Sequence, residues 1–538
     1  MTTQAKSQNT DYAAGILRCA SEAALVAILS TLFFCWISVR SEYVGNLSDA
    51  AVYLSQSDYF SPFRPAPYDI GAAMFYEYSF PPLFPLVLAL LGGGSEHPQL
   101  SYIATSIMMG AALGTVYLWM RSLPLAITAA LTMTLAFGLL PASLLTAMGM
   151  QSEPLYVAMI FAGLACWNLR ASIPRTAPLG AGLIGLSSLV RMVGVSAIAA
   201  LLIAWFLDPG RRYKILIPLL ALAPITAWLL LRTAAGMNES YVDFVRQDSV
   251  GATLSFVANQ IARNPAAMWS GLVRGFDLLG LQHATAAVVL FTGVFCVGWG
   301  VRLRRCELDA LYLLFYLGII LLWPFPNHMR RFLQIVLPIY LAYIYLGSIT
   351  LASSFDSRFV RRTVSGAVLI AIIIVMAPST GIMIGQIIAA EGTEAEDYVR
   401  APQWYEYDTP TNAAKVMGRV RRVLEAMRGI DELLPPAICV SSAIYAYIPM
   451  YGHRRAVPLP GILVGDQAFF EALKECPYVF MMSGSVWPPS AFPSMYPHER
   501  IKERFDVIEV SLFDETATRG AVLTMLGKVR FPHDDSER

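Results

Sequence analysis

Long apolar runs, separated by short polar or charged segments, follow one another from the N-terminus to about residue 390. An α-helix needs about 20 predominantly apolar residues to cross the core of a bilayer, so runs of nearly this length predict membrane-spanning helices. No small-residue cleavage site follows the first run, which we interpret as an uncleaved span rather than a signal peptide. Eleven spans are predicted: Ala23–Val39 and approximately 100–120, 124–141, 153–169, 177–190, 193–207, 215–234, 284–301, 308–323, 332–351 and 364–388.

The basic residues between these runs predict the orientation of the chain. Cytoplasmic loops of membrane proteins carry an excess of Lys and Arg. In this sequence the basic clusters follow every second span and fall on the same side as Lys6 and Arg18. The N-terminus is therefore predicted inside and the C-terminus outside. The clusters are Arg121; Arg170 and Arg175; Arg211, Arg212 and Lys214; Arg302, Arg304 and Arg305; and Arg358, Arg361 and Arg362.

Three of the outer stretches are long, namely residues 40–99, 235–283 and 389–538. The first contains Phe80–Leu91, an apolar run that is too short to span and that predicts a helix lying at the membrane interface. The second places Trp269 among arginines and predicts another surface-lying segment.

The last stretch has the pattern of a small α/β domain. Apolar positions recur at near-helical spacing over Thr411–Leu434, and a second helix is predicted over Gly465–Glu475. We therefore divide the chain into a membrane domain, residues 1–390, which includes the first outer loop, and an outer domain, residues 391–538. Strands of the outer domain are predicted at Ala437–Ser441, Tyr478–Met482, Val507–Leu512 and Ala521–Leu526.

Composition supports this division. Apolar residues make up 56% of the 538 positions and charged residues 14%, whereas a typical soluble domain has about 25% charged residues. Residues 391–538 alone carry 37 of the 77 charged residues, so the low average comes from the membrane domain. The high apolar content excludes a disordered chain, and the net charge of +1 argues against a nucleic-acid-binding protein.

The seven cysteines show no CxxC motif or Cys/His spacing typical of a metal site. Cys439 and Cys476 are the two that lie in the predicted outer domain. They can form a disulfide in an oxidising compartment, but the sequence does not give their distance, so the paired and the free form both stay open. The other five are expected to pack as small apolar residues.

Ionisable side chains close to the spans converge on the outer face. Charges near a bilayer core are costly, so such groups are the first candidates for function. Each also has an ordinary interpretation: a solvated loop charge, a charge favoured by a helix N-terminus, or an arginine that binds lipid headgroups. The shared face and the order of the groups favour a functional site. The set consists of Asp49, Glu77, Glu153, Arg191 and the segment Pro324–Phe332 with His328, Arg330 and Arg331.

The order of motifs is also informative. An acidic loop follows the first span, and then come the run Phe80–Leu91, Ser-Glu-Pro-Leu-Tyr at 152–156, Leu-Val-Arg-Met-Val-Gly at 189–194 and Arg-Arg-Phe-Leu-Gln-Ile-Val-Leu-Pro at 330–338. This order resembles the integral-membrane glycosyltransferases of the GT-C superfamily, within it the bacterial protein-mannosyltransferase-like and lipid A aminoarabinose-transferase-like branch. The resemblance covers nearly the whole chain, including the outer domain with its Gly-His-Arg-Arg at 452–455.

The resemblance implies an enzyme that transfers a hexosyl- or pentosyl-type sugar from a polyprenyl-phosphate donor. The acceptor would be a glycolipid, a polysaccharide or a protein of the cell envelope. The reaction would take place at the outer face of the bacterial plasma (inner) membrane, in contact with membrane lipid, and would invert the configuration at the sugar carbon. No nucleic acid is implied as a partner.

The resemblance also implies roles for single residues. Asp49 matches the acidic residue of the first outer loop, which acts as catalytic base or orients the acceptor. Glu77 and Glu153 match further acidic positions that in some members help to hold a divalent metal ion, and Tyr53 is expected beside them at the acceptor. The positions that would face the lipid phosphate are Arg191, Arg330 and Arg331, with His328 as a possible addition.

The residue types suit this chemistry, since arginine pairs well with a phosphate leaving group and a carboxylate can take the proton of the attacking hydroxyl. A lipid-linked oligosaccharide flippase or another transporter is the first alternative, and a polysaccharide polymerase is the second. Transporters often show repeated halves and charges near the midplane. This chain shows no internal repeat and has its charges at one face, which favours an enzyme. A non-catalytic scaffold would not need the acidic set.

Overall fold

The computed structural model describes residues 2–38, 48–63, 80–208, 213–235, 249–278, 282–355, 357–393, 395–406, 410–442, 444–458, 473–474, 476–482, 506–512 and 524–530. By its internal contacts the chain divides into two compact units. The first unit comprises Met1–Val39, Ser79–Phe84 and Tyr102–Glu391, and the second comprises Arg40–Tyr78, Pro85–Ser101 and Gly392–Arg538.

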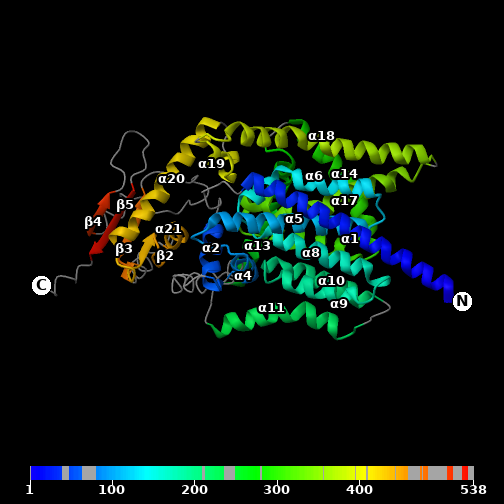
Figure 1. The fold of residues 1–538 in the computed structure, drawn as a ribbon, viewed down its shortest axis with the longest axis horizontal. Coiled ribbons are helices and arrows are strands. Elements are labelled where there is room, and N and C mark those ends of the chain that lie inside the picture. Colours follow the sequence, from blue (N-terminus) through cyan, green and yellow to red (C-terminus); the bar gives the residue numbers. More distant parts are fainter. Residues whose placement is uncertain are drawn as a thin grey trace. The chain divides into compact units, whose positions relative to one another are not determined.

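The first unit is a helical bundle (Figure 1). Each predicted apolar run coincides with a helix, because a chain in an apolar environment must satisfy its own backbone hydrogen bonds. The α-helices described in this unit are α1 Thr2–Ser38, α5 Pro98–Ser122, α6 Ile127–Leu139, α7 Pro141–Met148, α8 Glu153–Asn168, α9 Thr176–Ser187, α10 Val195–Leu207, α11 Leu216–Ala234, α13 Val250–Phe276, α14 Gln282–Arg304, α15 Leu308–Leu321, α16 Met329–Gln334, α17 Leu337–Ala352 and α18 Arg358–Ala390. Short 3₁₀ turns are η1 Leu169–Ala171, η2 Met192–Gly194 and η3 Pro326–His328.

The apolar helices are those of a membrane protein. Among the described residues, six are long and apolar enough to cross a bilayer, and the bent pair α6–α7, with an angle of 55°, adds a seventh. Four shorter apolar helices, α9, α10, α15 and α17, complete the eleven predicted runs, although their lengths do not settle how many cross. The predicted number of spans and the predicted orientation thus stay predictions.

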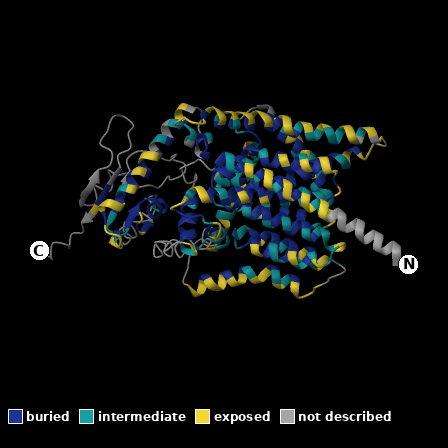
Figure 2. Ribbon diagram, viewed as in Figure 1, coloured by how far each residue is buried: buried dark blue, intermediate teal, exposed yellow. Residues whose placement is uncertain are grey.

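The interior of the bundle is close-packed. Figure 2 shows buried residues inside the bundle and exposed residues along one side of α11 and α18. The exposed side chains include Leu230 and Ile374, which are 66% and 62% exposed and are suited to contact lipid. Helices α14 and α17 approach each other through Gly298 and Gly347, where a Cβ atom would overlap the backbone of the other helix. Such small residues are typical of close contacts between membrane helices.

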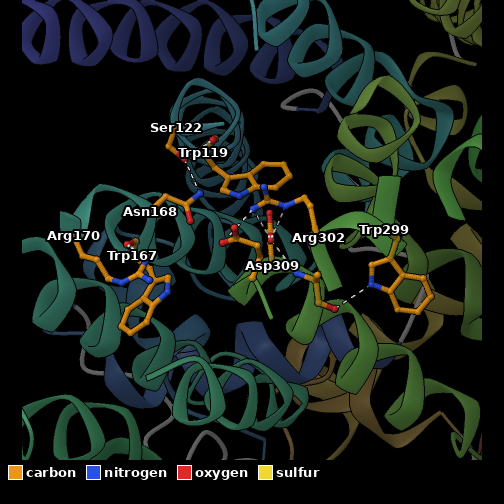
Figure 3. A network of polar contacts seen from close by, with 10 residues as sticks. Trp119, Ser122, Trp167, Asn168, Arg170, Trp299, Arg302 and Asp309 are labelled. Carbon is orange, nitrogen blue, oxygen red and sulfur yellow. Dashed lines mark hydrogen bonds and ion pairs between the residues drawn. The ribbon is translucent and has the colours of Figure 1, made fainter. Parts of the chain in front are cut away.

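At the end of the bundle where the sequence predicts cytoplasmic loops, two charged side chains form a buried ion pair. Arg302 at the end of α14 donates two hydrogen bonds to Asp309 Oδ1, at 3.1 and 2.9 Å, from Nε and Nη2 (Figure 3). Nearby, the guanidinium of Arg170 lies 4.3 Å from the centre of the Trp167 ring. The sequence suggested for Arg302 only a part in the orientation of the chain in the membrane. In the structure it also links α14 to α15.

The second unit combines helices from the first outer loop with the C-terminal part of the chain. Its five-stranded sheet has the order β2-β1-β3-β5-β4. Strand β1 is parallel to β2 and β3, and β5 is antiparallel to β3 and β4. The elements are α2 Ser48–Phe60, α4 Leu83–Leu90 (whose first two residues belong to the first unit), α19 Glu396–Val399, η4 Pro402–Glu406, α20 Pro410–Leu433, β1 Val440–Ser442, η5 Tyr445–Tyr447, α21 Ile448–Tyr451, β2 Ala456–Pro458, β3 Tyr478–Met482, β4 Asp506–Leu512 and β5 Thr524–Arg530.

The small mixed sheet agrees with the predicted α/β character of the C-terminal part. The longest helix of the second unit, α20, lies where the sequence predicts one. Most of the other helix, predicted over 465–475, falls outside the described residues. Cys439 and Cys476 form a disulfide with their Cα atoms 5.2 Å apart, which settles the alternative that the sequence left open. Arg454 closes the end of α20, because its guanidinium donates to the Asp431 carboxylate at 2.6 Å and to the Leu434 carbonyl at 3.1 Å.

Candidate active site

A buried cluster of three charges lies at the start of α8. The carboxylate of Glu153 is fully buried and accepts from two arginines. Arg191 Nη1 lies 2.6 Å from Glu153 Oε1. Arg331 contacts the same carboxylate through Nε, to Oε1, and through Nη2, which lies 3.3 Å from Oε2. These side chains come from α8, from the turn between α9 and α10, and from α16, so the fold joins three segments that are far apart in the sequence.

The backbone and an aromatic ring fix Arg191 in this cluster. The residue has extended backbone angles, φ −147° and ψ 131°, between two helical segments, so its side chain leaves the turn rather than the helix surface. Its Nη1 also donates to Ser152 Oγ at 3.1 Å. The guanidinium carbon lies 5.3 Å from the centre of the Phe332 ring, within the range of a cation–π contact.

Helix α13 holds the segment that carries Arg331. At Gly271, a Cβ atom would lie 2.7 Å from the backbone nitrogen of Arg330, so a glycine is required for this close approach. About two turns earlier on the same helix, the Asn264 side chain donates to the carbonyls of Leu321 and Trp323 at 2.9 and 2.7 Å. This fixes the end of α15, from which the chain enters η3 and α16. The predicted surface-lying segment of the second outer stretch is therefore a helix that packs against α16.

Two guanidinium groups face the single carboxylate of Glu153 in this cluster. Both arginines are largely buried, with exposed side-chain fractions of 13% for Arg191 and 9% for Arg331. An anionic group placed beside the two guanidinium groups would be stabilised by their charges. Arginine is suited to this because its planar guanidinium can donate two hydrogen bonds to one phosphate.

An apolar cavity of about 340 Å³ lies among α13, α14, α15, α16 and α17. Leu333, two residues after Arg331, is part of its wall. Its polar groups are the hydroxyls of Thr292 and Tyr340, which hydrogen-bond to each other at 2.8 Å. A cavity of this character suits a hydrocarbon chain. Its wall consists of Pro265, Met268, Trp269, Leu272, Thr292, Phe295, Leu313, Leu317, Leu321, Leu333, Val336, Leu337 and Tyr340.

The remaining predicted site residues fall into three groups. His328 and Arg330 lie on η3 and α16, beside Arg331, and the His328 ring is 6.2 Å from the Phe332 ring. Asp49 and Tyr53 lie on α2 in the second unit, where Asp49 is in the first helical turn. Glu77 lies outside the described residues.

The metal ion that the resemblance implies finds no suitable ligands around Glu153. Both oxygens of this carboxylate already accept from guanidinium groups, and two neighbouring positive charges disfavour a cation. No group of three or more His, Cys, Asp or Glu suited to a metal occurs in the part of the chain that the structure describes.

Sequence reasoning did not find the apolar cavity, the pairing within the cluster, or the parts played by Ser152, Asn264 and Gly271. The sequence predicted a surface-lying segment within the second outer stretch, where α13 lies, because Trp269 stands there among arginines. Its partner could not be inferred, since the contact joins residues about 60 positions apart.

The fold is shared with known membrane glycosyltransferases of GT-C type. The structure of ArnT, a lipid A aminoarabinose transferase, from Cupriavidus metallidurans bound to undecaprenyl phosphate aligns with a TM-score of 0.50 at 12% identity, over 94% of this chain and 97% of ArnT. The same enzyme in the apo state gives a TM-score of 0.51 at 13% identity, over 96% and 98%. The resemblance drawn from the motif order is thus confirmed for the fold.

A more distant match is the Archaeoglobus fulgidus oligosaccharyltransferase tethered to an acceptor peptide. It has a TM-score of 0.44 at 14% identity over 85% of this chain and 68% of that enzyme, too low to support an argument. No family model and no curated protein sequence matches the chain. The comparisons therefore establish the architecture and leave the activity to be argued from the site.

Proposed function

We propose that this protein is a glycosyltransferase that moves a sugar from a polyprenyl-phosphate donor to an acceptor of the cell envelope. The observation that carries the proposal is the buried Arg191–Glu153–Arg331 cluster, which brings two guanidinium groups together, one of them on the helix α16 that also contributes Leu333 to the wall of an apolar cavity. A phosphate attached to a hydrocarbon chain has the two properties that such a site would recognise.

In this reaction the sugar leaves a phosphate, on which negative charge develops. Arg191 and Arg331 stabilise that charge, and their donors are already oriented by Glu153, Ser152 and the Phe332 ring. Glu153 thus acts as an anchor for the two arginines rather than as a base. We assign His328 and Arg330, from the same segment as Arg331, to the binding of the same phosphate.

The attacking hydroxyl of the acceptor must lose its proton. We assign this task to Asp49, at the first turn of α2, because a carboxylate placed within hydrogen-bond distance of a hydroxyl can accept its proton. Tyr53, one turn further along α2, would contact the acceptor. A single displacement at the sugar carbon from the side opposite the phosphate inverts its configuration.

The Cys439–Cys476 disulfide supports an outer location for the C-terminal part, because disulfides persist in oxidising compartments. Together with the basic loops on the other side, it favours a bacterial plasma membrane protein with its site at the outer face. A donor that is anchored in the bilayer needs no nucleotide-binding loop.

The proposal is tested by mass spectrometry of envelope glycans from cells with and without the protein, complemented with the parent chain or with the Asp49→Asn variant. We expect one sugar modification to disappear without the protein, to return with the parent chain and to stay absent with Asp49→Asn. Restoration by Asp49→Asn at the parent level would remove Asp49 as the base. An unchanged glycan profile without the protein would contradict the proposed activity.

A further inference from the structure

Helix α2 is enclosed far more completely than its sequence suggests. Its residues from Ala50 to Asp58 are all buried, although four consecutive ones, Ser55, Gln56, Ser57 and Asp58, are polar and are at most 4% exposed. Four consecutive helical residues point in all directions around the helix axis. An outer-loop helix of this composition would normally keep a solvated face. Other elements must therefore surround α2 on every side.

Part of the enclosure comes from a segment nearly 400 residues later in the chain. The turn η5 and helix α21, which together cover Tyr445–Tyr451, contact α2 (Figure 1). Both are buried, and the rings of Tyr447 and Tyr451 stack with centroids 6.5 Å apart. The segment follows β1 directly and precedes β2, so the sheet of the C-terminal part determines where it lies.

The other end of α2 is tied to the loop before α5. Ser95 N donates to both carboxylate oxygens of Asp58, at 3.1 and 3.2 Å, and the Ser95 hydroxyl donates to Asp58 Oδ2. Gly93 makes room for this loop, because a Cβ atom there would lie 2.6 Å from Ser101 Oγ. The carboxylate of Asp58 is thus fully engaged in holding two segments together.

We propose that the C-terminal domain is a positioning element for the helix that carries Asp49, acting through Tyr445–Tyr451 and completed by the Asp58–Ser95 hydrogen bonds. This inference rests on the proposed function for the role of Asp49, but its structural part, the dependence of α2 on the C-terminal domain, is testable alone. Asp58 and Tyr447 are then positioning residues, because they act through α2 and contact no substrate.

The structural part is tested by hydrogen–deuterium exchange on the full-length protein in lipid nanodiscs. Tyr447→Ala removes a buried ring of the C-terminal domain, and we expect it to raise the exchange rate of the α2 amides at least about 10-fold, since loss of packing lowers the free energy of local opening. The Tyr447→Phe variant keeps the ring and should exchange more slowly than Tyr447→Ala. As a matched control, Arg421→Ala removes an exposed side chain of α20 in the same domain and should leave the exchange of α2 at the parent rate.

The catalytic part is tested by measuring kcat and KM for the lipid donor. A displacement of a catalytic group by about 1 Å can cost about 10²-fold in rate. We therefore expect Asp58→Ala and Tyr447→Ala to lower kcat by 10- to 100-fold with the donor KM within about twofold, because the donor phosphate binds to the arginines of the other unit. Asp58→Asn, whose amide oxygen still accepts from Ser95 N, should recover part of the rate.

Each outcome decides the proposal. Parent-like exchange of α2 in a folded Tyr447→Ala variant, or an equal rise in the Arg421→Ala control, would overturn the dependence of α2 on Tyr445–Tyr451. Faster exchange with unchanged kcat would overturn the positioning role in catalysis. If the parent protein transfers no sugar, the proposed function fails, and the exchange experiment still tests the link between α2 and the C-terminal domain.

Discussion

Replacing Glu153 by glutamine should destabilise the candidate site. Two guanidinium groups contact the buried Glu153 carboxylate in the parent, and Glu153→Gln removes the negative charge with which both of them pair. Removing one partner of a buried ion pair typically costs about 3–5 kcal/mol of folding free energy. Arg331→Ala removes one guanidinium group and keeps the Arg191–Glu153 pair, so it should cost less.

Added polyprenyl phosphate should stabilise the least stable of these proteins most. An anion that binds to both guanidinium groups replaces part of the interaction that they make with the Glu153 carboxylate, so it should stabilise Glu153→Gln most, the parent less and Arg331→Ala least. For a ligand at 100 times its Kd, the expected stabilisation is about 2.7 kcal/mol. The assay is thermal unfolding of the protein in nanodiscs with and without polyprenyl phosphate.

Arg302→Ala provides the matched control for this assay. It breaks a separate buried Arg–carboxylate pair, Arg302–Asp309, and should lower the unfolding temperature without changing the shift caused by the lipid phosphate. The reasoning is refuted if Glu153→Gln is as stable as the parent without ligand. It is also refuted if Arg331→Ala keeps the full ligand-induced shift.

Three further predictions concern other parts of the chain. Asp49→Asn should lower sugar transfer at least about 100-fold while donor binding, measured by the same thermal shift, stays at the parent level. An apolar cavity of about 150 Å³ holds a six-carbon ring, so 340 Å³ corresponds to about 13 carbons, and a C15 prenyl phosphate should bind within about threefold of a C55 one in a competition assay. Desolvation raises the pKa of Asp431, but hydrogen bonds from His453 and Arg454 outweigh it and hold that pKa below its ordinary value of 3.8. The stability that Asp431 contributes is therefore present above pH 3.8 and lost as the pH falls below it. Asp431→Asn should therefore unfold at a lower temperature than the parent at neutral pH, and this difference, followed by circular dichroism, should shrink as the pH falls below 3.8.

The helices could be predicted from the sequence because their signal is local. A run of apolar residues in a bilayer has no alternative to a helix, and the runs at 100–120 and 364–388 became α5 and α18. The strand β2, with three residues that include Pro458, was missed, because so short a segment has no alternation to detect. The disulfide was undecided for a related reason, since the distance between two cysteines depends on the whole sheet.

The candidate site was only partly accessible from the sequence. Its residues could be named, because charged side chains beside apolar runs are rare. Their pairing could not, since Glu153 and Arg331 are 178 positions apart and meet through the packing of α8 and α16. Glu153 was therefore grouped with the acidic residues at the acceptor, whereas the structure places it between two arginines. The enclosure of α2 was equally hidden, because it depends on a segment of the C-terminal domain.

The most direct test of the account is turnover by the reconstituted protein. The purified chain in nanodiscs is incubated with polyprenyl-phosphate sugars extracted from its own membranes and with an envelope acceptor fraction, and released polyprenyl phosphate and modified acceptor are measured by mass spectrometry. We predict that both products form in equal amounts with the parent protein and that both are lost with Asp49→Asn and reduced with Arg331→Ala. Absence of both products with a folded parent protein would contradict the account. So would turnover by both variants at the rate of the parent.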